Sequence, residues 1–231
     1  TITCAIQKQD EWSRVRRSLM RKGGEKWQYQ YKKQGVHRVS FPCHEESFYY
    51  AMQLQLSPAE LLGRLPHSIT SIDDVREQLP AALEAWLAQR TTVKKWLNTL
   101  DWSLERIDFA CDVQHLSWQE LNSFIALARA GQAPQHFGVL HLLDWKGTAV
   151  YGNQNERVQF YDKGKQMRKK HADEDPAVIA AYQGTLRVEV QISKQRLDRI
   201  KKMAGEKRRT LGQFLKPGLA EAIVRQRVDE V

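Results

Sequence analysis

The chain has 231 residues, 42% of them hydrophobic, including seven tryptophans. That length and composition allow a buried core and exclude a disordered protein. A formal net charge of +9 favours a polyanionic partner, with nucleic acid first and an anionic membrane second. No run of about twenty apolar residues exists, so no membrane-spanning helix is predicted. Of the two polyanions, nucleic acid is the expected partner, and no membrane partner is expected.

The first residues and the cysteines indicate how the chain was processed and in which compartment it lies, and the lack of repeats and linkers indicates its domain organisation. The first residues, TITCAIQKQD, include neither an initiator methionine nor a signal-peptide pattern, so we expect a trimmed or excised chain. Cys4, Cys43 and Cys111 lack C-x-x-C spacing, which argues against a zinc ribbon or a disulfide framework and suits a reduced cytoplasm. With no internal repeat or linker, one domain is expected, formed by residues 1–216 with a helical tail at 217–231.

Short strands and turns are expected in the first fifty residues, where WQYQYKK alternates after Gly23-Gly24. The next alternating stretch, YYAMQLQLS, leads into a helix start in which Ser57 is the N-cap, Pro58 the first helical residue and Glu60 the capping-box acid. Residues 72–100 then have the spacing of one or two amphipathic helices, interrupted near Pro80.

Three more alternating strands follow, SLERIDFACDVQ, ERVQFYDKGK and TLRVEVQIS, with helices between and after them. A second capping box at 117–120 starts a helix that stops at Gly131. Further helices are expected at 175–184, at 195–204 and from Leu211 onward. The pattern predicts an α+β fold with a mainly antiparallel central sheet, which has helices on one face and polar residues on the other.

The alternation gathers chemically useful side chains on that polar face, provided that the strands share one sheet. Carboxylates suit Mg²⁺ or Mn²⁺, a tyrosine can form a covalent bond to phosphorus, and cations can neutralise a transferring phosphate. Together they predict a metal-assisted phosphoryl-transfer site. The residues on this face are Gln53, Gln55, Arg106, Asp108, Asp112, Tyr161, Lys163, Arg187, Glu189 and Gln191.

Simpler interpretations of the same residues remain open. Asp108 near Arg106 is also the pattern of a surface ion pair, and the same holds for Glu189 near Arg187. Asp112 is near a strand end, where an aspartate often starts a turn.

The tyrosines and histidines leave alternatives of their own. Tyr161 near Lys163 is also the pattern of a surface tyrosine beside a solvated lysine, and the rival nucleophiles are Tyr49, Tyr50, Tyr151 and Tyr182. No His-hydrophobic-His motif exists, and His136 and His141 share no face at a spacing of five. A histidine-based metal site is therefore not supported, although His141 alone stays open as a ligand.

At these residues the chain resembles a known family. The order of S-P-A-E-L-L, E-R-I-D-F-A, V-Q-F-Y-D-K-G and L-R-V-E-V-Q-I, between residues 49 and 216, resembles that of the filamentous-phage replication initiators of the gene II type. The resemblance to rolling-circle initiators of staphylococcal-type plasmids is looser. The resemblance to the gene II type implies that Asp108 and Glu189 bind Mg²⁺ or Mn²⁺ and that Tyr161, with Lys163 in a Y-x-K motif, is the nucleophile.

One departure concerns the third metal ligand. The phage protein carries a carboxylate in the strand before S-P-A, where this chain has Gln53. Asp112 or a water is therefore expected as the third ligand.

The resemblance implies a metal-dependent nickase and religase that starts rolling-circle replication through a 5′-phosphotyrosine link, with residues 1–216 as the nicking domain. The expected partners are origin DNA and the host helicase and polymerase, and a homodimer stays open. The alternative is a non-catalytic DNA-binding protein that uses the basic stretches 163–171 and 194–209. The residues expected to contact DNA are Arg106, Arg168, Lys169, Arg187, Arg196, Arg199 and Lys202.

Overall fold

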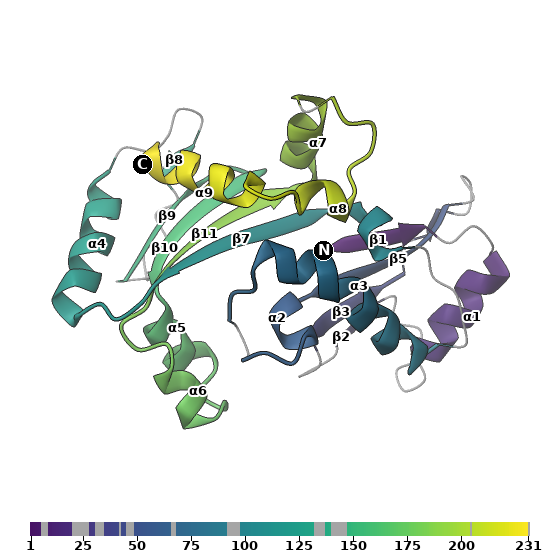
Figure 1. The fold of residues 1–231 in the computed structure, drawn as a ribbon, viewed down its shortest axis with the longest axis horizontal. Helices are drawn as coiled ribbons and strands as arrows, with labels where there is room; N and C mark the ends of the chain where they lie inside the picture. Colours follow the sequence, from purple (N-terminus) through teal and green to yellow (C-terminus); the bar gives the residue numbers. More distant parts are fainter. Residues whose placement is uncertain are drawn as a thin grey trace. The chain divides into compact units, whose positions relative to one another are not determined.

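The computed structural model describes residues 1–5, 9–19, 28–30, 35–41, 43–44, 49–65, 68–91, 98–131, 137–139, 147–203 and 205–230. These residues form two compact units, whose elements are labelled in Figure 1. The first unit comprises residues 1–106 and 197–217, and the second comprises residues 107–196 and 218–231. Both units combine helices with antiparallel strands, which confirms the α+β class. The functional division into 1–216 and 217–231 stays a prediction.

The first unit is built on an antiparallel sheet in which β5 is central. Among the described residues the strand order is β2-β3-β5-β1-β6, and β4 also pairs with β5. Met52 and Leu54 of β5 are fully buried whereas Gln55 is exposed, so the predicted alternation of this strand is confirmed. The strands are β1 (Ile2–Ala5), β2 (Gln28–Gln30), β3 (Val36–Ser40), β4 (Cys43–His44), β5 (Tyr49–Leu56) and β6 (Ser103–Leu104).

A helix near the N-terminus differs from the expected strands and turns. Residues Gln9–Leu19 form α1, which buries Trp12, Val15 and Leu19. Their spacing of three and four residues places them on one helix face. The indole Nε1 of Trp12 donates a hydrogen bond to the carbonyl oxygen of Ala51 in β5 at 3.0 Å, which fixes α1 on the sheet.

The other helices of the first unit follow the sequence more closely. The start of α2 (Pro58–Leu61) lies where it was predicted, although the Ser57 side chain makes no capping hydrogen bond. The predicted interruption at Pro80 is wrong, because α3 (Ile72–Ala88) continues through it. Residues 92–97 lie outside the described range, and the unit also contains η2 (Thr99–Asp101) and α8 (Leu211–Phe214).

The second unit contains a sheet of the order β7-β11-β10-β9-β8 among the described residues. The central strand β10 pairs antiparallel with both β11 and β9. The predicted strands around residues 108, 160 and 189 therefore share one sheet, but β5 with Gln53 belongs to the sheet of the first unit. The strands are β7 (Arg106–Val113), β8 (Gly138–Val139), β9 (Thr148–Gly152), β10 (Glu156–Asp162) and β11 (Leu186–Ser193).

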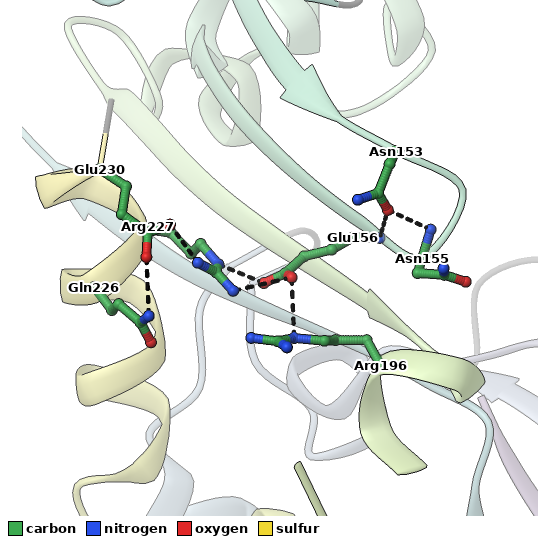
Figure 2. Close-up of polar contacts among 7 residues, drawn as sticks. All are labelled: Asn153, Asn155, Glu156, Arg196, Gln226, Arg227 and Glu230. Carbon is green, nitrogen blue, oxygen red and sulfur yellow. Dashed lines mark hydrogen bonds and ion pairs between the residues drawn. The ribbon is translucent and has the colours of Figure 1, made fainter. Parts of the chain in front are cut away.

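Helices α4 (Trp118–Ala130) and α9 (Leu219–Asp229) cover the apolar face of this sheet (Figure 1). Tyr151, which is opposite Val158 in the register, donates its hydroxyl hydrogen bond to the carbonyl oxygen of Ala128 in α4. Nε of Arg227 in α9 donates to Oε1 of Glu156 in β10 at 2.6 Å, and both side chains are buried (Figure 2). Helix α4 begins at the predicted capping box and ends at Gly131, as expected.

Two helices follow the ends of β10 and β11. The predicted strand ERVQFYDKGK ends at Asp162, whose side chain accepts a hydrogen bond from the backbone nitrogen of Lys165 at 2.8 Å. Helix α5 (Lys163–Lys170) therefore starts where a continued strand was expected. Helix α6 (Pro176–Ala180) is shorter than the predicted 175–184, and α7 (Lys194–Met203) confirms the helix predicted at 195–204. No described helix is both long and apolar enough to cross a membrane.

Candidate functional site

Three neighbouring strands of the second unit bring a tyrosine, an arginine and two carboxylates together. Tyr161 on β10 is opposite Arg187 on β11, and the Tyr161 hydroxyl donates a hydrogen bond to Oε2 of Glu189 at 2.8 Å. Nε and Nη2 of Arg187 donate to Oδ1 and Oδ2 of Asp112 on β7 at 2.6 and 2.7 Å. We call Asp112, Tyr161, Lys163, Arg187 and Glu189 the site cluster.

Tyr161 shares the polar face of β10 with Gln159, as the alternation predicts, but its side chain is only 5% exposed, so this face is covered there and not open to solvent. Burial raises its pKa well above the usual range, and the negative charge of Glu189 raises it further, while Arg187 acts in the opposite direction. The phenol is therefore protonated at neutral pH in the state that the structure describes.

Lys163 is buried as well, with 3% of its surface exposed. Its Nζ donates a hydrogen bond to Oε1 of Gln166 at 2.8 Å and lies 5.6 Å from the ring centroid of Tyr182. Burial, followed by the positive charge of Arg187, lowers the pKa of Lys163 to about 8. A Cβ at Gly164 would lie 2.7 Å from the carbonyl oxygen of Tyr182, so the close approach at the start of α5 requires glycine.

The rival tyrosines have packing roles. Tyr151 contacts α4 on the apolar face of the sheet, and its hydroxyl also reaches the carbonyl oxygen of Gly131 at 3.2 Å. Tyr182 is buried beneath two cations, with the Arg187 guanidinium 6.0 Å from its ring centroid. The side chains of Tyr49 and Tyr50 lie outside the described ones.

The carboxylates differ in their exposure and partners. Asp108 is exposed on β7, four residues before Asp112 and hence on the same strand face, next to the strand that carries Glu189. Asp112, predicted as a third metal ligand, is engaged by Arg187. Gln53 accepts a hydrogen bond from Ser40 at 3.2 Å in the sheet of the first unit.

Within the described residues no three His, Cys, Asp or Glu side chains are grouped so that they could hold a metal ion. Mg²⁺ usually keeps several waters and is held by one or two carboxylates together with substrate phosphates. The hard oxygens of Asp108 and Glu189 fit a cation bound in that way. His136 and His141 lie outside the described range.

The family model for the N-terminal region of the phage replication-associated protein encoded by gene II matches residues 25–211. The chain belongs to this family. The match confirms the resemblance to phage rolling-circle initiators of the gene II type and includes Asp108, Tyr161, Lys163 and Glu189. No curated protein and no solved structure matches the chain.

The basic residues of this gene II-family chain have different surroundings. Arg187 is engaged by Asp112, and Nε of Arg196 lies 3.1 Å from Oε2 of Glu156 (Figure 2). Arg199 and Lys202 are exposed on α7, and neither forms an ion pair with a described residue. The other residues expected to contact DNA are Arg168 and Lys169, exposed on the last turn of α5, and Arg106, at the boundary of the two units.

Sequence reasoning did not find the supporting side chains of the site. Gln166 was not considered, and Tyr182 was weighed only as a rival nucleophile. One signal in the sequence could have shown where Lys163 lies. Asp162 is a typical helix N-cap residue, and as an N-cap it places the start of a helix at Lys163. A helix start at that position would have removed Lys163 from the strand face.

Proposed function

We propose that this gene II-family chain nicks and rejoins one strand of an origin DNA through a metal-dependent reaction with a covalent 5′-phosphotyrosine intermediate. The observation that supports the proposal most is the hydrogen bond from Tyr161 to Glu189, with the cations Lys163 and Arg187 nearby. A nucleophile, a carboxylate and two positive charges in one cluster are the parts that phosphoryl transfer requires.

In the forward reaction the Tyr161 oxygen attacks the phosphorus of a phosphodiester. The bond from phosphorus to O3′ breaks, a tyrosyl ester to the 5′ phosphate forms, and the departing O3′ takes a proton. Glu189 is the described carboxylate that accepts the phenolic hydrogen bond, so it orients the hydroxyl and is placed to take its proton. The tyrosyl ester preserves the energy of the broken bond, so a 3′-hydroxyl can later reverse the reaction.

Charge stabilisation is assigned to the remaining members of the site. Lys163, with a pKa near 8, is mostly protonated at neutral pH, and Arg187 is charged throughout. Both offset the negative charge that develops on the transferring phosphate. Asp108 and Glu189 are the residues that would hold Mg²⁺ or Mn²⁺, which would supply further Lewis-acid stabilisation of the phosphate.

Access to Tyr161 imposes a requirement on this reaction. The side chain is only 5% exposed, so attack requires the phenolic oxygen to become accessible to the phosphodiester. Its lone pairs stay available for attack while the hydroxyl hydrogen is donated to Glu189. The expected partners are origin DNA first, then the host helicase and polymerase, and the expected compartment is the bacterial cytoplasm. A homodimer stays a prediction.

A nicking assay on supercoiled origin-containing DNA tests the proposal, run with Mg²⁺, with Mn²⁺ and with EDTA. We expect open circles with either metal and none with EDTA, and peptide mass spectrometry should locate the DNA adduct on Tyr161. An adduct on another tyrosine would reassign the nucleophile. Binding with no nicking under any condition would favour the alternative, a non-catalytic DNA-binding protein.

A further inference from the structure

Arg157 lies on the same face of β10 as the proposed nucleophile, four residues before Tyr161. It is directly opposite Gln191 of β11 and Gly152 of β9, and Gln159 lies between the arginine and the tyrosine. At about 3.3 Å per strand residue, Arg157 and Tyr161 are separated by about 13 Å along the strand. That separation is too large for both side chains to contact one phosphate.

The surroundings of Arg157 differ from those of the other buried or half-buried arginines that the structure describes in the second unit. Arg187 is engaged by Asp112, whereas Arg196 and Arg227 are both engaged by Glu156 (Figure 2). Arg157 is half-buried, its Nε is shielded from solvent without a hydrogen-bond partner, and the guanidinium forms no ion pair with a described residue. A partly desolvated cation without an anion is costly, and this cost indicates a ligand.

The neighbours of Arg157 favour an extended polyanion as that ligand. The half-buried amides of Gln159 and Gln191 can donate hydrogen bonds but carry no negative charge that would neutralise the arginine. Gly152 has no side chain, and a Cβ there would lie 3.0 Å from the Cα of Arg157, so no β9 side chain covers the arginine at this register position. The row from Arg157 to Tyr161 is therefore polar, with positive charge at its far end.

We propose that Arg157 binds a backbone phosphate of the DNA strand that Tyr161 attacks, at a position away from the scissile phosphate, so that the strand lies along β10. This inference rests on the proposed function, because it takes the reacting strand to reach Tyr161 over this sheet face. The inference adds a second phosphate-binding residue and the path of the DNA strand along β10. Neither the site cluster nor helix α7 defines that path. Arg157 is a positioning residue and does not contact the reacting atoms.

The test compares Arg157→Gln with Arg129→Gln. Arg129 is exposed on α4, which covers the opposite face of the same sheet, so its substitution removes equal charge from the wrong face. Both substitutions are made in a Tyr161→Phe chain, and binding to a fluorescent oligothymidine of about 20 nucleotides is measured by anisotropy in EDTA over a range of salt concentrations. These conditions remove nicking from the measurement.

Loss of one phosphate contact should weaken binding by about tenfold or more in Arg157→Gln. It should also reduce the slope of log affinity against log salt by about 0.7, the value for one single-strand contact. Arg129→Gln should change neither quantity. Arg157→Lys, which keeps the charge, should retain the salt slope, and thermal melts should show that every variant is folded.

Unchanged affinity and salt slope in a folded Arg157→Gln chain would overturn the inference, and so would an equal loss in Arg129→Gln. Because binding is read without cleavage, this result is independent of the nicking chemistry. If the wild-type chain does not nick DNA but the Arg157→Gln substitution still weakens binding, the proposed reaction is contradicted and the phosphate contact is supported.

Discussion

The hydroxyl of Tyr161 lies 2.8 Å from Oε2 of Glu189, and the two residues come from neighbouring antiparallel strands. The carboxylate holds the phenolic oxygen at a defined position, but its charge also raises the pKa of the tyrosine. The same contact therefore orients the nucleophile and suppresses its ionisation. Removal of the Glu189 charge should separate these two effects.

Tyr161→Phe should abolish both nicking and the covalent DNA adduct while DNA binding persists, because the ring stays and only the hydroxyl is lost. The measurements are gel conversion of supercoiled DNA and adduct detection by mass spectrometry. Tyr151→Phe is the matched control, since it removes a hydroxyl that contacts α4 on the opposite sheet face. Nicking at the wild-type rate by Tyr161→Phe would exclude Tyr161 as the nucleophile.

Glu189→Gln should lower the pKa of Tyr161 relative to wild type, because the substitution removes a negative charge beside the phenol. Ultraviolet titration of the tyrosines against a Tyr161→Phe reference measures that change. Nicking should nevertheless fall by orders of magnitude, since the proton acceptor and a proposed metal ligand are lost together. A variant with unchanged nicking would remove Glu189 from the chemistry even if the titration shifts.

Asp108→Asn tests the metal separately, because Asp108 lies on β7, which β11 separates from the strand that carries the phenol. We expect the loss of nicking to be partly recovered at high Mn²⁺, with little change in the free energy of unfolding because the side chain is exposed. Asp101→Asn, at an exposed residue of η2, is the control for a surface aspartate. Full wild-type activity in EDTA would contradict metal dependence altogether.

The rate of nicking should fall at high pH because Lys163 loses its proton there. Its pKa of about 8 means that its positive charge is lost as pH rises through 8, so kcat/KM should fall there relative to Lys163→Arg, whose charge persists. The measurement is single-turnover nicking from pH 6 to 10 at constant ionic strength. The same fall at high pH in Lys163→Arg would show that another group titrates.

Arg199 and Lys202 are the pair that we expect to hold DNA on α7. Both are exposed and three residues apart, so they share a helix face, whereas Arg196 is engaged by Glu156. Neutralising both should weaken binding for every duplex sequence and reduce the salt slope by roughly two, at about 0.9 per phosphate contact. Neutralising Arg129 and Arg225 is the charge-matched control. An unchanged slope in the test pair would place the DNA elsewhere.

The sequence predicted the helices and strands of this fold better than it predicted which strands pair with one another. Alternation located β5, β7, β10 and β11, and capping residues located α2 and α4. Alternation cannot tell which strands pair, because pairing is made by residues distant in the chain, and this is why Gln53 was assigned to the wrong sheet. Pro80 was expected to interrupt a helix, but the 17-residue α3 with a Ser71 cap continues through the missing hydrogen bond.

The candidate site was predictable in its residue types but not in its burial. Asp112, Tyr161, Arg187 and Glu189 lie on one face of three adjacent strands, as the period of two indicates. Their close pairing follows from the register of β10 and β11 and from the Asp112 ion pair. Alternation gives the side of a strand on which a residue lies but not how deeply other segments of the chain cover that side, so the burial of Tyr161 could not be predicted.

Strand β10 connects two sets of contacts that lie on opposite sides of the same sheet. At one end Glu156 faces Arg227 on the helix-covered side, and near the other end Tyr161 reaches Glu189 on the polar side. A deletion of one residue between them would invert one set relative to the other, since successive strand side chains alternate. The length of β10 can therefore change only in steps of two residues, and this restricts how the segment can evolve or be engineered.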